Sequence, residues 1–275
     1  MNFAVFGGDE RAVRLVRLLR RDGHTVEPFA LERALRCAAS PAEAMAEADS
    51  IVLPLPCERG GLLFAPLSER EWCPGELLSF SRAGTPVCAG QVGEKTAAAC
   101  RVNALPLYDY FRRESFTLQN ALLTAEGALA LLLASPDALG GSRVLITGYG
   151  RIGSLLARRL RALGAEVTVA ARSPAQRAAA ECDGVRAMRL AGLGGEFDFV
   201  VNTAPAPVLG ERELRALPGA ALIELASPPY GIDAAAAERL GRKVQLASGL
   251  PGKTAPEAAA KAVRDAVYAI LREER

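Results

Sequence analysis

The sequence predicts an α/β protein whose two domains each contain a parallel, doubly wound sheet. The chain has 275 residues, which is enough for two domains. Half of the residues are hydrophobic but only 5% are aromatic, a composition typical of α/β proteins rather than of disordered chains. Short apolar strands, for example at 143–147, 166–171 and 197–202, alternate with helical segments, and this alternation favours parallel sheets.

Charge, cysteine content and hydropathy exclude several classes of protein. The net charge of +2 is too small to indicate a nucleic-acid or anionic-membrane partner. The six cysteines form no Cys-x-x-Cys pair and the only histidine is His24, so we expect no metal site. The chain opens with a strand pattern instead of a signal peptide, and we expect no apolar run of membrane-spanning length. These features predict a cytoplasmic protein.

The first domain is expected at residues 1–116. It begins with a strand, the turn Gly7-Gly8-Asp9 and a helix over 10–21. This turn lacks the third glycine of a nucleotide-binding unit, and Asp9 would place a negative charge near a phosphate. We therefore expect a domain that does not bind a nucleotide, with Asp9 capping the helix. The last helix, 256–275, is expected to cross back and complete this domain.

The second domain is expected at 117–255 and opens with a long helix over 117–133 that joins the two halves. A buried strand at 143–147 then leads into a Gly-x-Gly-x-x-Gly turn and a helix. The residues of this turn are Gly148, Tyr149, Gly150, Arg151, Ile152 and Gly153.

The three glycines have different tasks in a dinucleotide-binding turn. Gly148 allows the tight turn, Gly150 lets the backbone approach a pyrophosphate, and Gly153 lets the helix pack closely on the strand. The amides at the helix start then face the anion. The alternative is a strand–turn–helix unit that uses glycine for packing alone. We predict that both domains are Rossmann-like and that the second binds the cofactor.

The end of the next strand indicates which dinucleotide binds. Units that bind NAD usually carry an acid there, about 20 residues after the glycines, for the ribose 2′-hydroxyl. Here the sequence reads Ala171-Arg172-Ser173. Arg172 can pair with a 2′-phosphate and Ser173 can donate a further bond, so we predict NADP. The alternative is that Arg172 is a solvated loop arginine.

Several longer phrases occur in a fixed order along the chain. They are 124–128, the glycine turn 148–153 with Ala171-Arg172-Ser173, Asn202-Thr203-Ala204-Pro205, 224–233 and 249–256. Together with the opening Gly7-Gly8-Asp9, these phrases resemble the A subunits of dipicolinate synthase from spore-forming bacteria. The resemblance covers nearly the whole chain and is densest from Thr124 onward.

This resemblance implies an NADP-dependent oxidoreductase in the lysine (diaminopimelate) branch that works during sporulation. Members act with a flavoprotein-like B subunit, and together they convert dihydrodipicolinate to the aromatic dicarboxylate dipicolinate. The resemblance therefore implies a hetero-oligomer and a small dicarboxylate substrate, with a homodimer as an open alternative.

Candidate contacts to such ligands lie at predicted strand ends. Beside the nicotinamide ribose we expect Asn202, Thr203, Ala204 and Pro205, although Asn202 and Thr203 could simply cap the loop. For a substrate carboxylate we expect Ser227 and the loop Gly249, Leu250, Pro251, Gly252, Lys253 and Thr254. Candidates for a catalytic role are Lys253, Glu126 and Asp233. Glu126 could equally be a helix-surface charge and Lys253 a surface lysine, and no pair stands out for proton transfer.

Two other functions fit the same motifs. One is another NADP-dependent dehydrogenase, acting on a shikimate-like or hydroxy acid substrate. Against it, the chain lacks a histidine in the cofactor half and an early lysine–aspartate pair. The other is a non-catalytic protein that senses a nucleotide or supports assembly.

Overall fold

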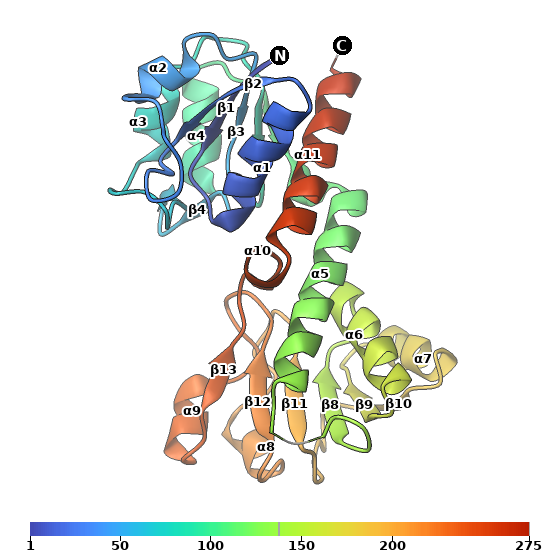
Figure 1. Cartoon of the computed structure of the whole chain (residues 1–275). Helices are drawn as coiled ribbons and strands as arrows, with labels where there is room; N and C mark the ends of the chain where they lie inside the picture. Colours follow the sequence, from blue (N-terminus) through green and yellow to red (C-terminus); the bar gives the residue numbers. More distant parts are fainter. Residues whose placement is uncertain (137, 275) are drawn as a thin grey trace. The chain divides into compact units, whose positions relative to one another are not determined.

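The computed structural model describes residues 1–136 and 138–274. The chain forms two compact units (Figure 1). Unit 1 comprises Met1–Asn120 together with the segment from Pro251 to the carboxyl terminus, and unit 2 is Ala121–Leu250. The limits expected from the sequence were 116 and 255. Each unit is built around its own sheet.

Unit 1 contains a five-stranded parallel sheet with the strand order β2-β1-β3-β6-β7. Its strands are β1 (Asn2–Phe6), β2 (Thr25–Phe29), β3 (Ser50–Val52), β6 (Val87–Ala89) and β7 (Leu107–Asp109). A separate antiparallel hairpin, which the sequence did not predict, consists of β4 (Glu58–Arg59) and β5 (Leu62–Leu63). The helices are α1 (Glu10–Arg21), α2 (Pro41–Met45), α3 (Pro74–Leu78), α4 (Glu94–Val102), a 3-10 turn η1 (Tyr110–Arg112) and α11 (Pro256–Glu273).

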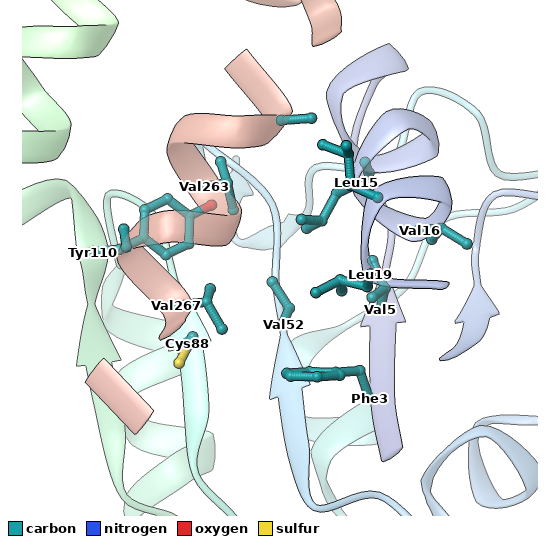
Figure 2. Close-up of a cluster of buried hydrophobic side chains, with 14 of the residues drawn as sticks. Phe3, Val5, Leu15, Val16, Leu19, Val52, Cys88, Tyr110, Val263 and Val267 are labelled. Atoms are coloured by element: carbon teal, nitrogen blue, oxygen red, sulfur yellow. The ribbon is translucent and has the colours of Figure 1, made fainter. Parts of the chain in front are cut away.

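Helices cover both faces of this sheet because successive side chains of a strand point to opposite faces. In β1, Phe3 and Val5 pack into the cluster that also contains α1 and α11. Ala4 and Phe6 pack into the opposite cluster, which α2, α3 and α4 cover. Figure 2 shows the first cluster, in which Val263 and Val267 of α11 meet residues of β1, β3 and α1. The carboxyl-terminal helix thus belongs to the core of unit 1.

Unit 2 contains a six-stranded parallel sheet with the order β10-β9-β8-β11-β12-β13. Its strands are β8 (Arg143–Thr147), β9 (Glu166–Ala170), β10 (Arg186–Met188), β11 (Phe199–Asn202), β12 (Ala221–Glu224) and β13 (Val244–Leu246). Its helices are α6 (Arg151–Ala162), α7 (Pro174–Cys182), α8 (Glu211–Arg215) and α9 (Ala234–Arg239). Two further helices cross the unit limits, α5 (Glu114–Leu133) and α10 (Leu250–Thr254).

The two strand orders differ in a way that matters for ligand binding. Numbered within its own unit, the sheet of unit 2 reads 3-2-1-4-5-6, which is the order of dinucleotide-binding domains. The sheet of unit 1 reads 2-1-3-4-5, which is the flavodoxin-like order. The predicted fold class, two Rossmann-like α/β domains with parallel doubly wound sheets, is confirmed. Only unit 2 has the strand order associated with dinucleotides.

Helix α5 corrects one expectation. By length and composition it could cross a membrane, whereas we expected no such run. However, Ala125, Ala128 and Leu132 of this helix are buried in the core of unit 2 together with α6. A core helix passes the same test of length and hydropathy, and the packing of α5 is that of a core helix.

Three local predictions also need correction. The strand expected at 104–108 is the shorter β7, and the one expected at 185–190 is the shorter β10. The segment 249–254, expected as a loop, forms the short helix α10 from Leu250 onward. Pro251 is compatible with this helix because a proline in the first turn loses no intrahelical hydrogen bond.

Candidate functional site

The glycine turn of unit 2 has the geometry that its sequence predicts. Gly148 adopts a positive φ of 93°, which non-glycine residues rarely adopt. A Cβ added at Gly153 would lie 2.4 Å from the carbonyl oxygen of Gly148, so the helix start packs directly on the turn. A Cβ added at Gly150 would meet nothing within 4 Å. The backbone at Gly150 is therefore open to a ligand.

Helix α6 presents its amino-terminal end at this opening. Gly150 is its N-cap and provides no capping side chain, and the first turn contains no acidic residue. The first N–H groups of a helix have no partner within the helix, and the helix dipole favours an anion there. This end of α6 is therefore suited to bind phosphate groups.

The side chain of Tyr149 turns away from the opening. Its ring is buried in the core of unit 2, and its hydroxyl donates to Asp183 Oδ2 at 2.6 Å. Burial and this bond raise the pKa of Tyr149 to about 12. The bonds from Tyr149 and Arg158 in turn lower the pKa of Asp183. Tyr149 can thus offer a ligand its main chain, while its side chain anchors the turn.

The loop after β9 carries an available cation. Arg172 is exposed, and its guanidinium makes no hydrogen bond or ion pair to the residues that the structure describes. Arg177 fixes the loop, since its Nη1 donates to the carbonyls of Ala171 at 2.8 Å and Arg172 at 2.7 Å. The hydroxyl of Ser173 accepts the Gln176 N–H at 3.4 Å, which leaves its own proton available for donation. This loop offers donors to an additional phosphate.

The strand ends of β8, β11 and β12 are joined by a buried polar network. Asn202 is 0% exposed. Its Oδ1 accepts from the Thr147 hydroxyl at 2.6 Å, and its Nδ2 donates to Glu224 Oε1 at 2.6 Å and to the Ala204 carbonyl at 3.0 Å. The polar atoms of the Asn202 side chain are therefore enclosed and bonded within the unit, and the place of this residue beside the nicotinamide ribose stays a prediction.

The rest of this segment lies closer to the surface. Thr203 is half-buried, and its hydroxyl donates to the Thr147 carbonyl at 2.9 Å. Thr203 also lies beside the glycine turn, since a Cβ added at Gly148 would be 2.9 Å from its Oγ1. Ala204 is half-buried and Pro205 is exposed. Thr203 and Ala204 therefore lie against the glycine turn, within reach of a ligand there, while the place of Pro205 beside the cofactor stays a prediction.

Glu224 also belongs to this buried network, and the sequence analysis did not identify it. Its carboxylate is 1% exposed and also accepts from three backbone amides, those of Ala226 at 2.9 Å and of Gly231 and Ile232 at 2.8 Å. Glu224 thus shapes the loop that contains Ser227, which is exposed. An acid at the end of an apolar strand, seven residues before Gly231, was the available signal.

Two of the candidates for catalysis have structural tasks. Asp233 is the N-cap of α9 and accepts the Ala236 N–H at 2.9 Å. Glu126 forms an ion pair with Arg159 at 3.5 Å, and its side chain is 49% exposed. Both carboxylates are thus engaged in positions typical of helix capping and of surface ion pairs.

The segment 249–254 contributes packing as well as a cation. A Cβ added at Gly252 would lie 2.6 Å from Asp9 Oδ2 and 3.0 Å from Arg11 Nε, so this glycine permits a close approach within unit 1. Pro251 and Gly252 are buried, whereas Lys253 and Thr254 are exposed. Lys253 makes no ion pair to any described residue. The expectation of a loop with free amides is replaced by a packed helical turn with an exposed lysine.

The corresponding turn of unit 1 is occupied by the chain itself. The Gly8 N–H donates to the Phe64 carbonyl at 2.8 Å, and Asp9 is the N-cap of α1, as the sequence predicts. Asp9 also accepts from Arg11 Nε and Nη2, both at 2.9 Å. A carboxylate thus lies where a phosphate would bind at this helix.

Family models match the two units separately. The model for the N-terminal domain of the dipicolinate synthase A subunit matches residues 2–111. The model described as "D-isomer specific 2-hydroxyacid dehydrogenase, NAD binding domain" matches residues 134–226. The second match includes the glycine turn, Arg172 and Asn202. Unit 2 is therefore a dehydrogenase-type domain for a nicotinamide dinucleotide.

Comparisons over the full length agree with these matches. The dipicolinate synthase A subunit of Bacillus subtilis (strain 168) is 28% identical, covering 99% of this chain and 96% of the relative. The crystal structure of the dipicolinate synthase A chain from Bacillus subtilis is similar to this chain with a TM-score of 0.83 and 28% identity, covering 99% of this chain and 96% of the solved chain. The corresponding structure from Bacillus halodurans has a TM-score of 0.86 at 25% identity, covering 98% and 97%. The amino-terminal match and the full-length comparisons show that this chain is similar to the A subunits of dipicolinate synthase over nearly its whole length.

Proposed function

We propose that this chain is the NADP-binding subunit of a dipicolinate synthase and oxidises dihydrodipicolinate to dipicolinate. The similarity to the A subunits of dipicolinate synthase supports the reaction. The observation that carries the cofactor assignment has three parts: no side chain caps α6, Arg172 has no partner among the described residues, and the segment 171–173 contains no acid. An acid there would repel a 2′-phosphate, whereas a guanidinium binds it through paired N–H groups.

The residues of unit 2 would hold NADP at two places. The amides at Gly150 and in the first turn of α6 would bind the pyrophosphate, and Arg172 with Ser173 would bind the 2′-phosphate. Thr203, Ala204 and Pro205 would lie beside the nicotinamide ribose. When bound, the cofactor supplies the acceptor for the hydride that leaves the dihydropyridine ring. The protein orients the ring, since aromatisation provides much of the driving force.

Substrate binding and the partner follow from the same proposal. Ser227 and Lys253 are exposed donors suited to a carboxylate. Asp233 caps a helix and Glu126 forms a surface ion pair, so this proposal does not use either carboxylate as the base for the proton that is lost together with the hydride. A flavoprotein-like B subunit completes the catalyst in this proposal, which places the complex in the cytoplasm of a sporulating cell.

The test is a turnover assay with the purified chain, alone and mixed with the B subunit. Dihydrodipicolinate and NADP⁺ are supplied, and formation of NADPH is followed by absorbance. We expect turnover, with a higher rate when the B subunit is present. Binding of NADP⁺ without turnover in either mixture would contradict the enzymatic assignment and favour a protein that senses a nucleotide or supports assembly.

The match to a hydroxyacid dehydrogenase domain favours one alternative, namely another NADP-dependent dehydrogenase. The same assay therefore includes 2-hydroxy acids and shikimate as substrates. Turnover of one of these in preference to dihydrodipicolinate would replace the proposed substrate and keep the proposed cofactor.

A further inference from the structure

Unit 1 contains a cavity at the point of its sheet where ligands bind in doubly wound proteins. Strand β1 lies between β2 and β3. The strand that follows β1 in sequence therefore pairs on one side of it, and the next strand pairs on the other side. The crevice outside the carboxyl ends of such a strand pair is the usual ligand position. The cavity lies there, lined by the turn Gly7-Gly8-Asp9, by Arg11 and by Leu53-Pro54-Leu55.

The walls of this cavity are largely apolar. Figure 2 shows five of its lining residues, Val5, Leu15, Val52, Tyr110 and Val263. The Tyr110 hydroxyl is engaged, since it donates to the Leu53 carbonyl at 3.1 Å. A pocket with apolar walls and few polar groups is typical of small-molecule sites. Besides Tyr110, the lining residues with polar side chains are Asp9 and Arg11.

Arg11 is a buried cation, 8% exposed, whose orientation is fixed on two sides. Asp9 holds Nε and Nη2 through two bonds of 2.9 Å, and Nη2 also donates to the Leu55 carbonyl. Gly252 packs against both residues, as the close approach of its Cβ position to Asp9 and Arg11 indicates. Asp9 is therefore a positioning residue for the guanidinium.

The second terminal nitrogen of Arg11 has a different environment. Nη1 makes no hydrogen bond to the part of the chain that the structure describes. Among the described residues, two buried side-chain nitrogens have no hydrogen-bond partner, Arg14 Nε and Trp72 Nε1, and Arg11 Nη1 is not one of them. Nη1 is thus unbonded but not enclosed, so it reaches accessible space. A guanidinium with one oriented, available edge is suited to a carboxylate or another oxyanion.

We propose that Arg11, oriented by Asp9, binds one carboxylate of the substrate at the carboxyl end of β1 in unit 1. The volume open to the centre of a water molecule is about 20 Å³, which is room for about one water molecule. The cavity is therefore large enough for one carboxylate oxygen and too small for the ring, which would stay outside. This inference deepens the proposed function by assigning a carboxylate-binding residue, and it rests on that function for the identity of the ligand.

The test measures binding of pyridine-2,6-dicarboxylate to the full chain by calorimetry, with NADP⁺ present. In Arg11→Met we expect affinity to fall about ten-fold or more, as for the loss of a charge-assisted hydrogen bond, while NADP⁺ affinity stays unchanged. The matched control is Arg20→Met on the same helix, which also loses a bond to a backbone carbonyl, that of Val26. This control should bind the dicarboxylate normally.

Arg11→Met leaves Asp9 without its partner, so its thermal unfolding is measured as well. Should it fail to fold, Arg11→Lys is used. An ammonium carries its three donors on one nitrogen and cannot reproduce the planar fork that holds Asp9 and presents Nη1, so affinity should again fall.

Normal affinity in a folded Arg11 variant would overturn the inference and leave the proposed function standing. If pyridine-2,6-dicarboxylate does not bind but pyridine-2-carboxylate or a 2-hydroxy acid binds in an Arg11-dependent manner, the proposed substrate is wrong and the inference holds. Binding of none of these carboxylates to the wild-type chain would overturn both.

Discussion

At the scale of single residues, polar side chains at or just after the strand ends of unit 2 have opposite environments. Asn202 and Glu224 are enclosed and fully bonded, whereas Arg172 is exposed and unpaired with respect to the described chain. Buried polar groups are retained when every atom has a partner. Exposed cations without a partner are available for ligands. Substitutions at the two kinds of position should therefore affect different properties.

Replacing Arg172 by alanine should weaken NADP binding selectively. We expect about a ten-fold loss or more for NADP, because charge-assisted bonds to the 2′-phosphate disappear, and little change for NAD. Calorimetry with both dinucleotides measures this difference. Lys243→Ala removes another exposed cation, just before β13, and serves as the control. Equal losses for NAD and NADP in Arg172→Ala would contradict the assignment.

Replacing Glu224 by alanine should strongly destabilise unit 2. The substitution leaves Asn202 Nδ2 and three backbone amides without their acceptor, and each buried donor left unsatisfied costs about 1–3 kcal/mol. Urea unfolding measures the change in the free energy of unfolding. Glu238→Ala on the exposed side of α9 should stay within about 0.5 kcal/mol of wild type. A small effect at Glu224 would show that the loop finds other partners.

At the scale of elements, the two helices that follow glycine turns differ in whether the amino-terminal end of the helix is open to an external phosphate. Helix α6 begins at Gly150 with no capping side chain and no acid in its first turn. Helix α1 begins at Asp9, which caps it and holds Arg11. Both helices have a dipole that favours an anion at this end, and the first N–H groups of each have no acceptor within the helix itself. The side chain at the N-cap decides whether an external anion can reach them.

Two glycine substitutions at the start of α6 should separate binding from stability. In Gly153→Ala the new methyl would lie 2.4 Å from the Gly148 carbonyl oxygen, so we expect loss of both stability and dinucleotide binding. In Gly150→Ala the methyl meets nothing within 4 Å, so stability should stay near that of wild type while binding falls. Thermal unfolding and calorimetry measure the two properties. Unimpaired NADP binding in Gly150→Ala would place the ligand elsewhere.

At the scale of the whole molecule, the chain builds unit 1 from two distant segments and unit 2 from one. The last helix, α11, supplies Val263, Val267 and Ile270 to the core of unit 1, beside α1. The cofactor turn lies entirely within unit 2. Damage to the core of unit 1 should therefore leave dinucleotide binding intact.

The substitution Val267→Asp tests this independence. Val267 is 1% exposed, and burial of an unpaired carboxylate should destabilise unit 1 by about 3 kcal/mol or more. NADP affinity at low temperature should remain that of wild type. Lys261→Asp, at an exposed position of the same helix, is the matched control and should change neither property. Parallel loss of NADP binding in Val267→Asp would show that the units depend on each other.

Much of the fold followed from the sequence because its signals are local. Apolar runs followed by glycine predicted the strands and turns of both sheets, and the spacing of Gly148, Gly150 and Gly153 predicted the turn at α6. Asp9 was predicted as a cap from its place before a helix. These signals depend on residues a few positions apart, whose periodicity and conformational preferences act before any tertiary contact forms.

The remaining features were decided by contacts between distant segments. Asn202 forms hydrogen bonds with Glu224 and Thr147. Gly252 packs against Asp9, which lies near the other end of the sequence. The sequence alone determined a nucleotide-binding turn, its position after β8 and the cation at residue 172. Only the tertiary structure decided which polar side chains are enclosed and which remain available, because burial depends on the packing of strand ends that the sequence places far apart.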